Sequence, residues 1–253
     1  MDLSNLNNNF LGIKRIMNLF AERMEPYAEK LRIAEQNATL LLEDFAEKAK
    51  PFRAFQILAE NQFTYWKPLC NIDVEGILTC SDVDKYLSER IEDITFIDYE
   101  KICADIVHSV LLSETNKSIL NQTIHAMDFG LYDLALVGTV TVFDGVLSVA
   151  TNDTATSIVK RLNAIRKRIE TYTDEEWELL HESDITTFGM YITWTKSMME
   201  FQKYSEFEKP ETEPQDLNRH WISHGRKTSG ATKLDCCKML NALYGLIYFG
   251  DAL

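Results

Sequence analysis

The stretch "YDLALVGTVTVFDGVLSVA", residues 132–150, decides the fold class of this chain. Its large apolar residues recur at helical spacing, so that Leu136, Val140 and Phe143 fall on one face. The run of Val and Thr would also suit a strand. However, 19 unbroken residues are too many for a typical strand. We therefore predict a long buried helix here and an all-α fold for the chain.

Asp144 lies near the middle of this apolar stretch. A membrane-spanning helix would be longer and would rarely carry an acid at that depth, so we expect a core helix of a soluble protein and no membrane association. A carboxylate in a core needs a partner. A structural salt bridge, for example to Arg219, and a catalytic role are both open, and the two are compatible.

The composition supports helices over the rest of the chain. The 253 residues include only five Pro and ten Gly, which favours long helices over many short strands. We expect Pro26 and Pro51 to interrupt or end the first helical segment, and Ser81 and Asp82 to form the N-cap of a later helix. The segment 71–80 is predicted as a loop or a short strand. The remaining helices are predicted over residues 53–66, 83–93, 99–112, 117–129, 155–172, 173–183, 186–204 and from about 232 onward.

The charge is unevenly distributed. The net charge is −13, which repels nucleic acid and membrane phosphates when it is spread uniformly. Residues 216–253 nevertheless carry five Lys or Arg and three acids, and "KRLNAIRKR", residues 160–168, carries five cations. A run such as residues 160–168 more often forms the solvent-exposed face of a helix than a surface that binds RNA. No signal peptide is visible and the five Cys have no disulfide spacing, so we expect a cytoplasmic protein with reduced thiols.

The segment "LNRHWISHG", residues 217–225, gathers two of the five His beside an Arg. An Arg can hold a phosphate and stabilise its growing negative charge, and a His can transfer protons near neutral pH. This pattern suits RNA cleavage without a metal. In an ideal helix His220 and His224 share one face, whereas Arg219 and His224 point about 140° apart. A short, irregular segment between Pro214 and Gly225, or a second copy of the chain, would resolve that separation.

These residues carry a family resemblance. "RHWISH", residues 219–224, resembles the R-x4–6-H motif of the HEPN superfamily, with His220 as the polar residue after the Arg. Three stretches resemble a bacterial and phage branch of this superfamily. The branch has a helix with an acid-Gly end, which "YDLALVGTVTVFDGVL" resembles, and an N-R-H-x3-H-G signature, which "LNRHWISHG" resembles. Its closing helix is similar to "TKLDCCKMLNALYGLIYFGDAL". The resemblance covers residues 113–253. This chain is more acidic than such RNA-cleaving proteins usually are.

The resemblance implies a multi-helix bundle and a metal-independent endoribonuclease that needs no cofactor, with a role in toxin–antitoxin, abortive-infection or other phage-defence systems. Arg219 and His224 would be the catalytic pair. Residues in supporting or substrate-binding roles would be Asn218, His220, Asp144, Arg226 and Lys227. Members usually act as homodimers, and an antitoxin or other partner protein is a further expectation.

Other interpretations stay open at this stage. The same motif could be a structural network in a catalytically silent module that dimerises or docks a partner protein. A zinc site built from His220, His224, Cys236 and Cys237 is a weaker alternative, because adjacent Cys residues are poor partners for one ion. We divide the chain near residue 112 into an N-terminal helical region, 1–112, serving as a cap, sensor or partner-binding arm, and a HEPN-like domain, 113–253.

Overall fold

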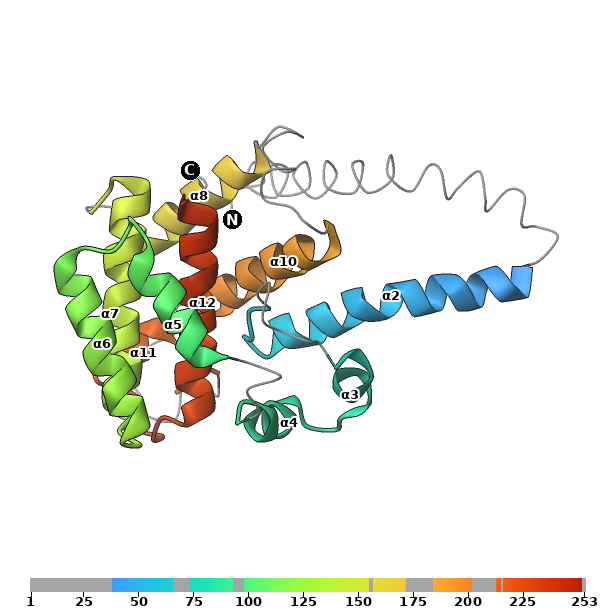
Figure 1. Ribbon diagram of the computed structural model, residues 1–253, viewed down its shortest axis with the longest axis horizontal. Helices are drawn as coiled ribbons and strands as arrows, with labels where there is room; N and C mark the ends of the chain where they lie inside the picture. The colour runs from blue at the N-terminus through green and yellow to red at the C-terminus, as the bar shows by residue number, and fades with distance from the viewer. Residues whose placement is uncertain are drawn as a thin grey trace. The chain divides into compact units, whose positions relative to one another are not determined.

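In the computed structural model of the chain, residues 38–65, 73–92, 98–154, 157–171, 184–201, 213–214 and 216–251 are described. Every regular element within these ranges is a helix, which confirms the predicted all-α fold. The helices (Figure 1) are α2 Ala38–Glu60, α3 Val74–Thr79, α4 Val83–Arg90, α5 Tyr99–His108, α6 Glu114–Asp128, α7 Tyr132–Thr151, α8 Ile158–Glu170, α10 Asp184–Phe201, α11 Arg219–Ser223 and α12 Lys233–Asp251.

Two local predictions are wrong. The segment predicted as loop or strand contains α3, because the Asp73 carboxylate accepts a hydrogen bond from the Gly76 N–H (2.9 Å) and starts a helical turn. Pro51 lies inside α2 rather than at its end. A proline removes only one intrahelical donor, and the strong helix formers around it keep the helix going. The predictions at Pro26 and over residues 173–183 lie outside the described residues.

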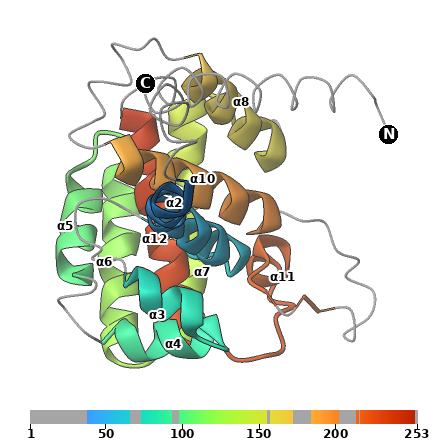
Figure 2. The same cartoon turned by 90° about the vertical axis from the view of Figure 1, so that its right-hand side faces the viewer.

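The chain divides into two compact units, Met1–Lys50 and Pro51–Leu253. In the second unit, α12 packs against α7, α10 and α5 and is buried over most of its length (Figures 1 and 2). Gly245 of α12 lies against the indole of Trp194 in α10, and the Trp194 Nε1–H donates to the Ala242 carbonyl (3.0 Å). This close contact between α10 and α12 forms the centre of the core.

The helices α6 and α7 form an antiparallel hairpin. Gly130 has a φ of +71°, the left-handed conformation that ends α6 and turns the chain into α7. Along the hairpin, Gly138 faces Thr123 and Gly145 faces Asn116, so closely that a Cβ at either glycine would overlap the facing side chain. These glycines let α7 approach α6 with its Asp144 side turned away from α6 and toward α11.

By length and composition, α7 is the one described helix that could cross a membrane. However, 44% of that apolar stretch is buried inside the fold. Its partners are α6, α8, α11 and α12. A core helix of this kind meets the same criteria, so the expectation of no membrane association stays a prediction.

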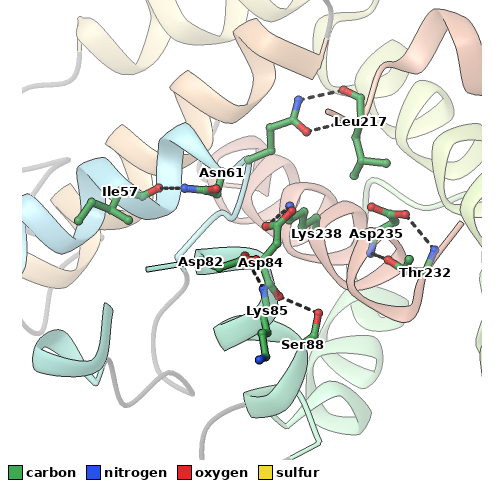
Figure 3. A network of polar contacts seen from close by, with 11 residues as sticks. Ile57, Asn61, Asp82, Asp84, Lys85, Ser88, Leu217, Thr232, Asp235 and Lys238 are labelled. Carbon is green, nitrogen blue, oxygen red and sulfur yellow. Dashed lines mark hydrogen bonds and ion pairs between the residues drawn. The ribbon is translucent and has the colours of Figure 1, made fainter. Parts of the chain in front are cut away.

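Polar contacts join residues on both sides of position 112. The Gln62 side chain clamps the backbone of Leu217: Nε2 donates to the carbonyl (2.9 Å), and the Leu217 N–H donates to Oε1 (2.8 Å). In Figure 3, the buried Lys238 of α12 reaches the carboxylate of Asp84 in α4 (2.7 Å). The roles assigned to residues 1–112 and 113–253 stay predictions, but these contacts place α4 and the end of α2 in one unit with α12.

Candidate functional site

The helix α11 is a single turn with a defined start and end. The Asn218 side-chain oxygen caps its N-terminus by accepting from the His220 N–H (3.0 Å). At the other end Gly225 has a φ of +63°, and the Arg226 N–H donates to the Trp221 carbonyl (2.8 Å). Trp221 itself is buried and anchors the turn in the core. The segment is thus short and ends at Gly225, which is one of the alternatives that the sequence left open, and Asn218 is its buried cap.

Arg219 and Asp144 form the charged centre of the site. The Arg219 Nε–H donates to both carboxylate oxygens of Asp144 (2.8 and 3.1 Å), and Nη2 donates to Oδ2. Both side chains are largely buried, with exposed fractions of 17% for Arg219 and 29% for Asp144. The salt bridge that the sequence left open is therefore present, and it joins α11 to α7.

This ion pair should contribute measurably to stability. We expect Asp144→Asn and Arg219→Gln each to lower the free energy of unfolding by about 2 kcal/mol, between the values typical of buried and surface pairs. The double variant should lose little more than either single variant, because each change leaves the other charge without its partner. Urea unfolding of the four proteins measures this coupling.

The exposed pair Glu114–Lys117 (2.8 Å) on α6 is the matched control for that cycle. Its coupling energy should stay below about 0.5 kcal/mol, because water screens both charges. If the Asp144–Arg219 coupling is no larger than that of the control pair, the ion pair does not hold α11 on α7.

His220 and His224 project from the same side of α11. Their rings are parallel within 3°, with centroids 6.4 Å apart. His224 is exposed, and its backbone N–H donates to the His220 carbonyl at the end of the turn (3.1 Å). Burial lowers the pKa of His220, the positive charges of Arg219 and His224 lower it further, and Asp144 opposes them. His220 is therefore held in its neutral form, which can accept a proton at neutral pH.

The structure brings five of the seven predicted site residues together. Asp144, Arg219, His220 and His224 interact around the exposed side of α11, and Asn218 caps its N-terminus. Arg226 and Lys227 follow α11 in the next loop. There Lys227 Nζ donates to the Ser229 hydroxyl (2.7 Å).

Gln62 is the positioning residue that the sequence analysis missed. Its clamp on Leu217 holds the backbone two residues before Arg219, although 155 positions separate the two residues. Gln62 also has a φ of +56°, a conformation that only the folded chain reveals.

A carboxylate closes the loop that carries α11. Glu213, just before the motif, accepts hydrogen bonds from the backbone and hydroxyl groups of Thr228 and Ser229, just after it. These bonds lower the pKa of Glu213 to about 2. Beyond them, the Ala231 N–H donates to the Asp133 carboxylate (2.7 Å), which ties the loop to the start of α7. We call the contact of Glu213 with Thr228 and Ser229 the Glu213 clasp.

The Glu213 clasp should depend on pH in a defined direction. The pKa of Glu213 is lower in the folded chain, about 2, than its ordinary value of 4.5. The stabilisation is therefore complete above about pH 4.5 and is lost as the pH falls toward 2. At pH 7 we expect Glu213→Gln to speed amide hydrogen exchange over residues 226–231, measured by mass spectrometry. Equal exchange in the two proteins at pH 7 would show that the clasp does not hold the loop.

The chain matches no family model, no curated protein and no solved structure. The HEPN resemblance therefore stays a prediction from the motif residues. Among the residues that the structure describes, no three His, Cys, Asp or Glu side chains are grouped to hold a metal ion. Cys237 and Cys236, the partners of the zinc alternative, lie in the core, where burial raises the pKa of the Cys237 thiol to about 12.

Proposed function

We propose that this protein cleaves RNA without a metal ion, using the side chains of α11. The observation that carries the proposal is the parallel pair His220–His224 beside a guanidinium that is held in place by a carboxylate. Two imidazoles on one side can serve as proton acceptor and proton donor in a single reaction. The proposed substrate is the phosphodiester backbone of RNA, whose own 2′-hydroxyl supplies the nucleophile.

In the proposed reaction the 2′-oxygen attacks the adjacent phosphorus, and the bond from phosphorus to the 5′-oxygen breaks. The proton of the 2′-hydroxyl passes to one imidazole, and a proton passes to the leaving 5′-oxygen from the other. His220, held neutral by burial, suits the acceptor role, and the exposed His224 then suits the donor role. The products are a 2′,3′-cyclic phosphate and a free 5′-hydroxyl, so atoms and protons balance.

Arg219 would stabilise the charge that develops on the phosphate. Asp144 binds the Nε and Nη2 sides of the guanidinium and leaves Nη1 to face another acceptor. A guanidinium fixed along one edge presents its remaining N–H groups in a defined direction, as charge stabilisation requires. Asp144 thus orients Arg219 in this proposal and contacts no substrate.

The wider setting of the proposal rests on the family resemblance alone. It includes a homodimer, an antitoxin or other neutralising partner protein, a cytoplasmic location and a role in phage defence. Arg226 and Lys227 would attract the RNA strand to α11, because the rest of the chain carries the negative charge.

A second candidate is a silent interaction module. It is favoured by the ion pair itself, since Asp144 already neutralises the charge of Arg219 within the fold. In that case α11 is a structural turn, and the acidic surface of the chain docks a basic protein.

The test is incubation of the purified full chain with a mixed RNA pool in EDTA, with analysis of the product ends. Cyclic phosphate ends support the RNase, and an RNA in which every 2′-hydroxyl is methylated should remain intact under the same conditions. Absence of cleavage by the wild-type chain would favour the interaction module. Cleavage of the methylated RNA would show a contaminant or a different chemistry.

A further inference from the structure

Arg161 of α8 carries a buried positive charge that the proposed chemistry does not use. Its exposed fraction is 8%. Among the described residues, its one hydrogen bond runs from Nη1 to the Ser148 hydroxyl (2.6 Å), and Nε is buried without a partner there. No carboxylate in the described part of the chain pairs with this guanidinium. A buried charge without a counter-ion is costly, so its retention calls for a reason.

The C-terminal turn of α7 explains only part of that charge. Ser148 lies in the last turn of α7, where the helix dipole presents about half a negative charge. Half a charge at a helix end does not balance a full guanidinium. The second terminal nitrogen, Nη2, makes no hydrogen bond and is not among the fully buried atoms, so this end of the side chain meets solvent. Nη2 is therefore the atom of this group at which an anion would make contact.

Arg161 is also connected to the site around α11. The Ser148 hydroxyl accepts from Arg161 and donates to the backbone carbonyl of Asp144 (2.8 Å), whose carboxylate binds Arg219. Asp144 and Ser148 are four residues apart in one helix, so the two guanidinium groups contact α7 at positions about 6 Å apart along its axis. That separation is comparable with the spacing of successive phosphates along an RNA strand.

We propose that Arg161 binds the phosphate next to the one held by Arg219, so that α7 sets the two guanidinium groups in register with the RNA backbone. The proposal rests on the proposed function, because it takes the ligand to be single-stranded RNA. Arg219 shares its charge with Asp144, whereas no carboxylate among the described residues pairs with Arg161, and the end of α7 offsets only part of its charge. Arg161 would then contribute affinity for the strand without taking part in proton transfer.

Binding of a fluorescent 2′-O-methyl oligoribonucleotide in EDTA tests this inference, since that strand cannot be cleaved. We expect Arg161→Gln to weaken binding about tenfold, the effect of losing one charge-assisted contact. It should also reduce the slope of log K against log salt by about 0.7, the value for one phosphate of a single strand. Arg161→Lys should restore most of that slope.

The matched control is Lys167→Gln, which removes one exposed charge from the same helix. Its effect on affinity should stay within about twofold. Equal losses from Lys167→Gln and Arg161→Gln would show only general charge attraction and would overturn the inference. So would a folded Arg161→Gln variant with wild-type affinity and salt slope.

A measurement on the wild-type chain covers the case in which Arg161→Gln does not fold. Single neutral methylphosphonates placed along the oligonucleotide should weaken binding at two adjacent positions. One sensitive position, or none, would overturn the inference. If unmodified RNA is not cleaved but binding still depends on Arg161, the proposed function is wrong and this inference stands. In that outcome the two arginines form an RNA-binding site without chemistry.

Discussion

His224→Ala is expected to reduce RNA cleavage in EDTA by about 100-fold or more, with the fold unchanged. General acid–base catalysis by a positioned side chain contributes about 10²–10⁴-fold to a rate. His224 is exposed, and alanine keeps the backbone N–H that donates to the His220 carbonyl at the end of α11. The rate of cyclic phosphate formation on a single labelled RNA measures the effect, and circular dichroism checks the fold.

His125→Ala is the matched control for this substitution. His125 lies on the exposed side of α6, where its ring is 4.0 Å from the Asp128 carboxylate. Cleavage by His125→Ala should equal that of the wild-type chain, purified in the same way. Equal cleavage by wild type and His224→Ala would mean that α11 is not the active site or that the activity is a contaminant. Arg219→Lys tests whether a positive charge alone is enough at this position, because lysine keeps the charge but loses the forked contact with Asp144.

Gly245→Ala should destabilise the protein by about 2 kcal/mol, a large effect for one methyl group. A Cβ at this position would lie 3.0 Å from Trp194 Cγ and 3.1 Å from Nε1, and closer still to the ring edge. The indole is 1% exposed and is held by its bond to the Ala242 carbonyl, so it cannot move aside without losing that bond. Alanine gains about 1 kcal/mol in helix propensity, which the overlap outweighs.

Gly230→Ala is the control for the added methyl group. No atom lies within 4 Å of a Cβ at Gly230, and its φ is not in the left-handed region. Its free energy of unfolding should change by less than about 0.5 kcal/mol. Urea unfolding followed by tryptophan fluorescence measures both variants. A Gly245→Ala protein as stable as Gly230→Ala would show that α10 and α12 are not packed as closely as described.

Local patterns in the sequence were enough to predict most of the helices and part of the site. Helical spacing indicated α7, and the buried acid within it predicted a partner for Asp144, which is Arg219. Asn218 and Gly225 have the side-chain and backbone properties that begin and end a short helix, so α11 was also foreseeable. In these cases the information lies within a few residues of the structure it specifies.

Contacts between distant segments could not be predicted in the same way. Nothing near Gln62 indicates that its amide will bind Leu217, because the contact depends on the finished fold bringing these two distant segments together. In the sequence, Arg161 looks like the other cations of its helix. Only the tertiary structure shows that it is buried beside Ser148. The effect of Pro51 was overestimated because one missing hydrogen bond does not end a long helix.

The Glu213 clasp has a consequence for how freely the chain can change in length. The clasp closes residues 213–229 into a ring whose ends are 16 positions apart. The entropic cost of closing the ring that contains α11 depends on the number of residues within the ring. It does not depend on the number of residues between Phe201 and Glu213. Insertions or deletions before Glu213 should thus be tolerated with the geometry around Arg219 unchanged.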